Sequence, residues 1–547
     1  MLAAILTCGL GMMLTSCSSS DEGETSGGND TPVSATGDVV LMYYAVGGGD
    51  LDDSTEQELG KFALQVSKES NVRGFVQYKY SAKRNSGWNY LYEPSGEYGS
   101  VYRFELNSNS LNPEYAGDVC KAKAFTGQGF RKYKGNDFKM YDPDNLVEFI
   151  NWCMEQAPGA KAYVLAFADH GGAYDISKDY DKSLTRGVMY DDNLTGKPCM
   201  SPMEIRTALS KLTRKPDMIF FDCCIMSNLE VLGELQGMTN YVFASGHSVV
   251  ESPLKELCSS LASAAKYSDI QEGLRKSMSD YVTIITNSMR DRMKRRLGER
   301  ILRSMDYTLT DMSKMPALFA SVKAATDFLT RADISGIDIE IFNQAASGCY
   351  RYVDDFPLID VVGYLKQLRD RPFKDNAEFA ALVSQVETAA KACHIAHDEF
   401  SYDTDGTDKK YDLTYSVTLG FSSYRLIFDD SNVKAHAPKE PQGAIMLTNL
   451  KEPPYYNDYL LENGDDFLAK WDDGQEMNFL NIIEYYAKGS GSHLSWDNTY
   501  RTTHFDKATG WSNWMKKNPG IYFDNPPYDD QYTYVYEKPT WDELTGE

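Results

Sequence analysis

A histidine and a cysteine each follow an apolar stretch that is typical of a buried strand. His170 comes directly after the run 162–168, and Cys224 follows the run 217–221, about fifty residues later. A thiolate can attack a carbonyl carbon while a histidine manages the proton, so the two side chains together can catalyse hydrolysis. Because parallel strands in α/β proteins place their reactive groups at their carboxyl ends, this pair predicts a cysteine hydrolase.

Cys224 needs surroundings that favour a negative charge, because the thiolate is the nucleophile. We expect a helix to begin at Met226, whose N-terminal N–H groups and dipole would favour an anion at Cys224. Gly171 and Gly172, which follow His170, carry no side chain and would leave their backbone N–H groups open to a developing oxyanion.

Two neighbouring side chains are alternatives to this pair. Cys223 directly precedes Cys224 and is the second candidate nucleophile, although a buried cysteine is most often an inert apolar residue. His247 follows the next predicted strand, 241–245, and is the second candidate base. It lacks the two glycines that follow His170, which favours a place for it in a loop or in a substrate-binding wall.

The elements around these residues alternate between strands and helices, which is typical of a parallel α/β sheet. Periodicity and helix-start residues predict strands at 39–44, 72–78, 162–168, 217–221 and 241–245, and helices at 52–66, 146–155, from 202 onward and 226–235. Ser201 is the expected N-cap of the third helix. Residues 81–140, rich in Gly, Asn, Ser and Tyr, should form a long excursion that contains a hairpin.

At 547 residues the chain is longer than one ordinary core, so more than one domain is expected. Composition divides it into a signal segment at 1–17, a flexible Ser/Gly-rich tether at 18–37, an α/β domain at 38–253, a helical region at 254–397 and a mixed C-terminal region with short β-like runs at 398–547. No second apolar stretch reaches about 18 residues, so no transmembrane helix is predicted.

The N-terminus resembles a bacterial lipoprotein signal. The apolar stretch from Met1 to Leu14 is too short to span a bilayer, and Cys17 follows it before a polar sequence. In such signals the cysteine is acylated, so we expect a lipid anchor at Cys17. The expected location is the bacterial cell envelope, at the outer membrane, the cell surface or the periplasmic face. No Lys or Arg precedes the apolar stretch, and an ordinary cleaved signal peptide is the alternative.

Charge and ligand spacing exclude two other classes of function. The net charge of −24 argues against nucleic acid, whose affinity for proteins comes largely from Lys and Arg contacts to phosphate. Cys393, His394 and His397 have a helical spacing, but third and fourth metal ligands are not evident, and no CxxC pair exists. We therefore expect no metal site.

Taken together, the two reactive segments resemble the clostripain family of cysteine peptidases, within the caspase–gingipain–legumain superfamily. The resemblance rests on Asp169–Gly172 and on Asp222–Glu230, and it covers roughly residues 38–250. It implies a caspase-like, mostly parallel sheet flanked by helices, followed by an additional helical and β-containing C-terminal region. It also places Cys224 at the nucleophile and Cys223 at the usual alanine, and the spacing to Glu230 favours this assignment.

The same resemblance implies the reaction. Cys224 would attack the peptide carbonyl to form a thioester, and His170 would carry the proton to the leaving amine. Backbone N–H groups of Gly171 and Cys224 would hold the oxyanion. Peptide and protein chains would be the substrates, with no cofactor required. Calcium is left open, because some members of the family need it.

Substrate preference and maturation also follow from the resemblance. Asp222 would bind an Arg or Lys side chain at P1 through charge-assisted hydrogen bonds. The alternative is an acid that caps the turn after its strand. Self-cleavage would follow Lys182 or Arg186, between the histidine and the cysteine. Two departures put a strict P1 preference in doubt, since Ser227 replaces the usual glycine and 245–248 replaces an acidic run.

Two other functions stay open on the sequence alone. One is a non-catalytic surface binding lipoprotein on a peptidase-derived fold. The other is a different hydrolase or transferase that uses the same Cys–His geometry, because a fold does not fix a function. The intact pair of His170 and Cys224 favours the peptidase.

Overall fold

The computed structural model describes residues 38–49, 51–81, 94–113, 124–173, 187–191, 193–194, 198–250, 252–297, 304–350, 352, 358–402, 408–418 and 500–517. Cys17, Lys182 and Arg186 lie outside these described residues, so the predictions made for them concern parts of the chain on which the structure is silent.

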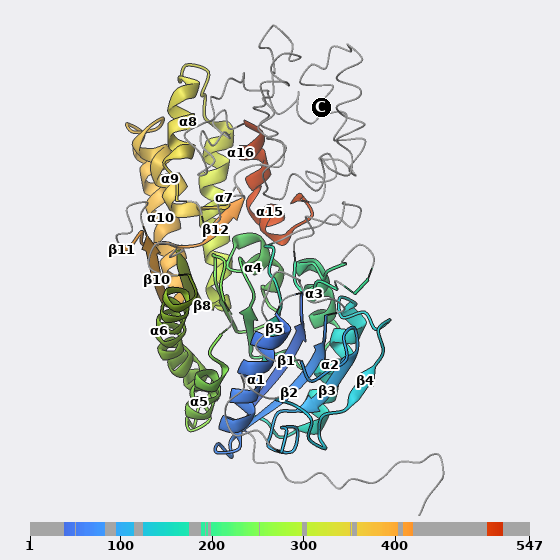
Figure 1. The fold of residues 1–547 in the computed structure, drawn as a ribbon. Coiled ribbons are helices and arrows are strands. Elements are labelled where there is room, and N and C mark those ends of the chain that lie inside the picture. Colours follow the sequence, from blue (N-terminus) through green and yellow to red (C-terminus); the bar gives the residue numbers. More distant parts are fainter. Residues whose placement is uncertain are drawn as a thin grey trace, which may run out of the picture. The chain divides into compact units, whose positions relative to one another are not determined.

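Ten strands of the described chain form one mixed sheet in the order β11-β10-β8-β7-β6-β5-β1-β2-β3-β4 (Figure 1). The five inner strands are parallel: β1 (Val39–Val46), β2 (Val72–Lys79), β5 (Ala162–Ala168), β6 (Met218–Asp222) and β7 (Tyr241–Ala244). The outer strands run antiparallel to their inner neighbours: β3 (Val101–Glu105), β4 (Lys132–Lys134), β8 (Met305–Asp311), β10 (His394–Tyr402) and β11 (Asp408–Lys409). A separate pair joins β9 (Leu358–Asp360) to β12 (Ser416–Thr418).

The inner strands are mostly apolar, because helices cover both faces of the sheet. Successive side chains of β6 alternate between two core clusters: Met218 and Phe220 belong to one, and Ile219 and Phe221 belong to the other. This alternation decides on which face each residue at the end of β6 lies.

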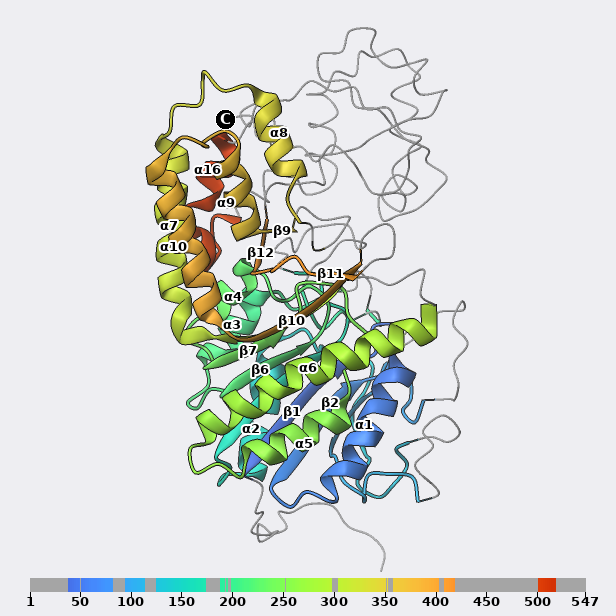
Figure 2. The ribbon, with the colours of Figure 1, turned by 90° about the vertical axis from the view of Figure 1, so that its left-hand side faces the viewer.

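The face of Met218 and Phe220 packs against α1 (Asp52–Val66), α5 (Leu254–Ala264) and α6 (Ile270–Leu297), which lie side by side in Figure 2. The opposite face packs against α2 (Pro143–Gln156), α3 (Pro202–Ser210), α4 (Leu229–Leu235) and α7 (Met315–Arg331). Further helices pack with α7 and with one another: α8 (Ile339–Ser347), α9 (Val361–Asp370), α10 (Ala377–Cys393), α15 (His504–Thr509) and α16 (Trp511–Lys517).

Local signals set the helix starts that flank β5. Asp142 accepts the N–H of Asp144, and Pro143 occupies the first turn of α2. Ser201 and Glu204 form a capping box at the start of α3, which confirms Ser201 as the N-cap. These caps fix the chain directions that lead into β5 and β6.

The predicted sheet is confirmed, and α1 and β5 have the predicted bounds. Strands β3 and β4 pair antiparallel within the predicted excursion, as a hairpin requires. The prediction of a helical region at 254–397 was wrong in part, because the strands β8 and β9 lie inside it. The helical spacing assumed for Cys393, His394 and His397 was also wrong: Cys393 ends α10, and both histidines lie in β10.

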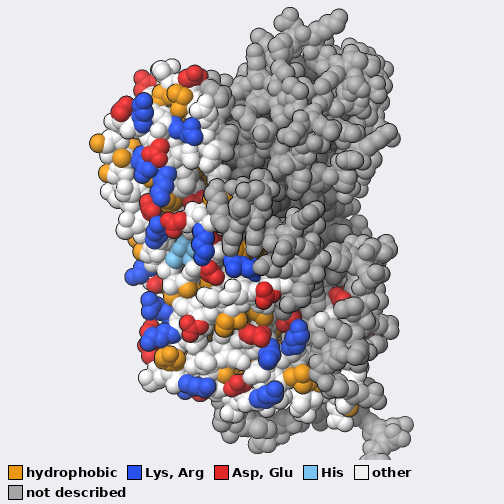
Figure 3. Space-filling view, turned by 60° about the vertical axis from the view of Figure 1, so that its left-hand side comes forward, with side chains coloured by type: hydrophobic (Ala, Val, Ile, Leu, Met, Phe, Trp, Pro, Cys, Tyr) orange, Lys and Arg blue, Asp and Glu red, His pale blue; other side chains and the backbone are white. Residues whose placement is uncertain are grey.

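None of the described helices is both long and apolar enough to cross a lipid bilayer. On the face shown in Figure 3, acidic and basic side chains are interspersed, with apolar side chains scattered among them. That face has the mixed charge of an ordinary solvated surface.

Candidate active site

Strands β5 and β6 deliver His170 and Cys224 at the same offset from their last paired residues. Ala168 lies opposite Asp222 in this parallel pair, and each candidate residue lies two positions further on. The two loops touch at Gly171, where an added Cβ would lie 1.9 Å from the Cys224 carbonyl oxygen and 2.7 Å from its nitrogen. Only glycine therefore permits the contact that brings the two segments together.

The exposed ring of His170 is oriented by the loop after β1. Its Nε2 lies 3.1 Å from the carbonyl oxygen of Gly48. A carbonyl only accepts hydrogen bonds, so Nε2 carries the proton in this pair, and Nδ1 is the basic nitrogen. Gly48 has φ +58°, and a Cβ there would lie 2.8 Å from the His170 Cδ2. No pattern in the sequence marks Gly48 as part of the site.

Asp169 and Gly172 connect the His170 loop to residues 187–190. The buried carboxylate of Asp169 accepts the His170 N–H at 2.7 Å and also the N–H of Tyr190. The N–H of Gly172 donates to the Gly187 carbonyl at 3.0 Å. The expectation that this N–H is open to an oxyanion was therefore wrong, since a strand-like contact already uses it.

The half-buried thiol of Cys224 meets donors from two other loops and itself donates to the Val249 carbonyl at 3.7 Å. The Val249 N–H lies 3.3 Å from Sγ. Burial raises the pKa of the thiol, hydrogen bonds from the N–H groups of Val249 and Gly171 and from Ser248 oppose that rise, and the nearby Asp222 carboxylate adds to it. The pKa of Cys224 is above its usual value as a result.

The donors that face this sulfur do not come from the helix expected at Met226. The helix α4 begins at Leu229, where the Asn228 side chain accepts the Val231 N–H at 2.9 Å. The intervening N–H groups of Ile225 and Ser227 pair with carbonyls of the segment after β7 instead of continuing a helix. The predicted helix start was therefore wrong, and Asn228, a strongly preferred N-cap residue, is the signal that could have placed it.

Cys223 lies on the opposite side of the strand end from Asp222. Its thiol is buried in the same core cluster as Ile219 and Phe221, and it donates to the Phe167 carbonyl at 3.3 Å. Burial raises the pKa of this thiol well above its usual value. These surroundings are those of an inert core cysteine.

Asp222 lies on the sheet face that carries α1, α5 and α6. Its Oδ2 accepts the Tyr43 hydroxyl at 3.0 Å, and its Oδ1 accepts the Ser252 N–H at 3.0 Å together with the Ser252 hydroxyl. These bonds tie the end of β6 to β1 and to the segment after β7. Neither Tyr43 nor Ser252 was identified from the sequence.

His247 is 2% exposed and is held from two sides. Its Nδ1 lies 2.6 Å from Asp306 Oδ1, and its Nε2 lies 2.8 Å from the Tyr350 hydroxyl. Both ring nitrogens thus have protein partners. The structure places this second candidate base in an internal hydrogen-bonded network rather than at the exposed edge that carries His170.

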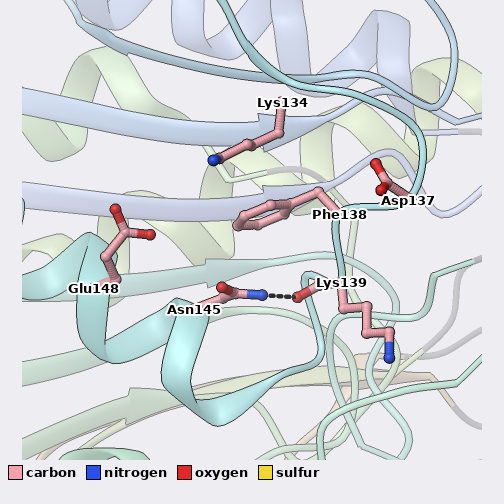
Figure 4. A pocket seen from close by; sticks show the side chains of 6 residues that line it. All are labelled: Lys134, Asp137, Phe138, Lys139, Asn145 and Glu148. Atoms are coloured by element: carbon pink, nitrogen blue, oxygen red, sulfur yellow. Dashed lines mark hydrogen bonds between the residues drawn. The ribbon is translucent and has the colours of Figure 1, made fainter.

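A surface pocket lies apart from these residues, between β4 and α2 (Figure 4). It is lined by side chains of both charges and one aromatic ring: Lys134, Asp137, Phe138, Lys139, Asn145 and Glu148. Asn145 donates to the Lys139 carbonyl at 2.9 Å. Neither candidate catalytic residue lines this pocket.

Solved structures that align with this chain include three of C11 proteases. A secreted C11 cysteine protease from Bacteroides thetaiotaomicron, "iotapain", aligns with a TM-score of 0.45 at 15% identity over 69% of this chain and 91% of its own. A secreted C11 protease from the same organism, in complex with an irreversible peptide inhibitor, aligns with a TM-score of 0.44 at 12% identity and covers 80% of this chain and 99% of its own. An inactive zymogen C11 protease from Parabacteroides distasonis aligns with a TM-score of 0.43 at 14% identity and covers 70% of this chain and 92% of its own.

No protein of curated function matches the sequence. A sequence model of the clostripain family (Peptidase_C11) matches residues 119–517, which is well over half of the chain and includes both strand ends described above. The chain therefore belongs to the clostripain family of cysteine peptidases.

Proposed function

We propose that the protein is an endopeptidase in which Cys224 is the nucleophile and His170 the general base and acid. The contact of Gly171 with the Cys224 backbone carries this assignment, because it joins the two loops next to both side chains. The half-burial of Cys224 and the core position of Cys223 support the choice between adjacent cysteines.

In the proposed reaction, Cys224 Sγ bonds to the scissile carbonyl carbon while its proton passes to His170. The carbonyl oxygen becomes an oxyanion near the N–H groups of Gly171 and Cys224. His170 then protonates the amine as the C–N bond breaks, leaving a thioester. Water hydrolyses the thioester to the acid and restores the thiol. No cofactor takes part in these proposed steps, and calcium enters none of them.

Asp222 is the proposed binding group for Arg or Lys at P1. It lies two residues before the nucleophile, and its orientation is fixed by Tyr43 and Ser252. A carboxylate in this place attracts a guanidinium or an ammonium group through its charge and through charge-assisted hydrogen bonds. The proposal therefore extends to cleavage after basic residues.

Self-processing after Lys182 or Arg186 is proposed as the maturation step. Its support is that residues 187–190, which follow these sites, bond to Asp169 and Gly172 beside His170. Cleavage of the chain upstream of Gly187 would therefore change the contacts of the loop that carries His170. If wild-type protein and Cys224→Ala both run intact on a denaturing gel, this step is contradicted.

Attachment to the cell envelope through acylated Cys17 is proposed from the signal-like N-terminus. Metabolic labelling with an alkyne fatty acid should mark the wild-type protein and not Cys17→Ala. A labelled Cys17→Ala protein, or an unlabelled wild type, would contradict a lipid anchor at that residue.

Fluorogenic peptides ending in Arg, Lys, Asp or Asn test the function as a whole, with reductant and with either calcium or EGTA. We expect cleavage after Arg and Lys that disappears in Cys224→Ala and His170→Ala and persists in Cys223→Ala. A wild type that cleaves none of these peptides in either buffer would favour the non-catalytic binding lipoprotein.

A further inference from the structure

We propose that His247 and Asp306 form a buried positioning pair for the thiol of Cys224. They act through residues 245–249, which follow β7 and are called the strap below. The catalytic meaning of this proposal rests on the proposed function, whereas its geometric claim concerns only the surroundings of one sulfur atom and can be tested separately.

Asp306, in β8, fixes the start of the strap. Its Oδ1 accepts the Ser245 hydroxyl at 3.1 Å, the Gly246 N–H at 2.9 Å and the His247 ring at 2.6 Å. The carboxyl group is 1% exposed, and a buried charge is costly unless it is paired. Burial raises the pKa of Asp306, but His247 and the Gly246 N–H outweigh it and hold the pKa below its usual value, so the carboxylate stays ionised.

The strap also forms hydrogen bonds with residues 225–227, the turn that directly follows Cys224. The His247 carbonyl accepts the Ile225 N–H at 3.0 Å, and the Ser245 carbonyl accepts the Ser227 N–H at 2.8 Å. Ile225 has φ +60°, a left-handed conformation that a β-branched residue rarely adopts. Such a turn persists only where its surroundings determine it, and here the strap supplies the two backbone acceptors.

The strap also reaches the sulfur itself. Two residues after His247, the Val249 N–H lies 3.3 Å from Cys224 Sγ, and Ser248 also hydrogen-bonds to the thiol. A donor at this position stabilises the thiolate relative to the thiol. A shift of the His247 ring would therefore move the donor as well as the turn.

Titratable and aromatic side chains from several neighbouring elements face His247, Asp306 and Cys224. His247 meets Asp306 of β8 and the hydroxyl of Tyr350, and its ring lies 4.8 Å from the centroid of Tyr352. His397 of β10 acts on Asp306 through its charge. On the thiol side, Asp222 is the charged neighbour that raises the pKa of Cys224.

The test measures alkylation of Cys224 by iodoacetamide as a function of pH, with the modified peptide identified by mass spectrometry. The variants are His247→Ala and Asp306→Asn. We expect the midpoint of the pH profile to rise by about one unit in each, so that the rate near neutral pH falls about tenfold. In peptide cleavage, kcat should fall more than KM rises.

His504→Ala is the matched control, because it removes another histidine–carboxylate contact, the 2.9 Å pair with Glu234. It should leave the midpoint at the wild-type value. If His247→Ala does not fold, Asp306→Asn and Tyr350→Phe carry the test, the latter with a smaller shift in the same direction.

A wild-type midpoint in the folded variants of His247, Asp306 and Tyr350 would overturn the proposal, whatever their melting temperatures. Because alkylation needs no peptidase activity, a wild type that cleaves no peptide would contradict the proposed function while leaving this readout intact. The two failures are thus distinguishable.

Discussion

The two strand ends that carry the candidate catalytic residues are built in opposite ways. At the end of β5, His170 is exposed, and the partner described for its ring is a backbone carbonyl, that of Gly48. At the end of β6, Cys224 is half-buried, its backbone touches Gly171, and Val249 donates to its sulfur. One end presents an exposed ring, whereas the other surrounds a half-buried sulfur atom.

This difference fits the two roles proposed for the residues. A base that accepts a proton from sulfur and delivers it to a leaving amine must reach two positions, so an exposed ring suits it. A nucleophile has to meet one carbonyl carbon at one angle, and a misplacement of about 1 Å can cost about a hundredfold in rate. We therefore expect changes near Cys224 to be the more damaging.

The largest effect should separate the two adjacent cysteines. Cys224→Ala should lower kcat/KM for Arg peptides by more than about a thousandfold, because it removes the atom that forms the thioester. Cys223→Ala should keep kcat/KM within a few-fold of wild type and cost about 1 kcal/mol of stability, because its thiol only fills the core. Peptide cleavage and thermal melting of both proteins check this. The reverse pattern would make Cys223 the nucleophile.

Alanine at the two glycines compares the strand ends directly. Gly171→Ala should lower kcat about a hundredfold, because its Cβ would lie 1.9 Å from the Cys224 carbonyl oxygen, and backbone must move. Gly48→Ala should lower kcat about tenfold, since its Cβ would meet side-chain atoms of Asp169 and His170. Gly159→Ala is the control, with nothing within 4 Å. Equal losses at Gly48 and Gly171 would mean that both ends are equally rigid.

The positions of the two candidate residues at strand ends could be predicted because their signals are local. An apolar run, an abrupt polar residue and small residues after it mark each strand end, and the register of β5 with β6 then brings the two ends together. The same holds for α1 and β5, whose patterns lie within their own residues.

The partners of those residues could not be predicted, because they come from distant parts of the chain. Gly48 follows β1, Val249 follows β7 and Asp306 lies in β8, and no pattern near Cys224 points to any of them. One signal was available and was missed. Met305, Tyr307 and Leu309 alternate with polar residues, a period of two that indicates a strand inside the supposed helical region.

A replacement of Asp222 should change two measurements in opposite directions. Asp222→Asn removes the negative charge that raises the pKa of Cys224, so the alkylation midpoint should move to lower pH. Cleavage after Arg and Lys should nevertheless fall about tenfold or more, because the amide cannot pair with a cation.

The sign follows from the thiolate being the reactive form: a lower pKa gives more thiolate at a given pH below the midpoint. Asp169→Asn is the comparison at the other strand end. The Asp169 carboxylate accepts hydrogen bonds from the backbone of His170 and Tyr190. Its loss should therefore lower the cleavage of peptides with Arg at P1 and of peptides with an uncharged P1 residue by the same factor. If Asp222→Asn also lowers the cleavage of all peptides by the same factor, Asp222 anchors the loop at Ser252 and does not select the P1 residue.

The smallest expected effect concerns the turn after Cys224. Ile225 has φ +60° and is 5% exposed, so Ile225→Ala and Ile225→Gly both lose its packing. They differ in backbone: glycine adopts positive φ without strain, whereas alanine keeps most of the penalty. We expect the glycine variant to be the more stable by about 1 kcal/mol in chemical denaturation, the reverse of the usual order of these residues. If alanine is as stable as glycine, the turn stores no strain, and the rigid end of the sheet owes its geometry to the strap alone.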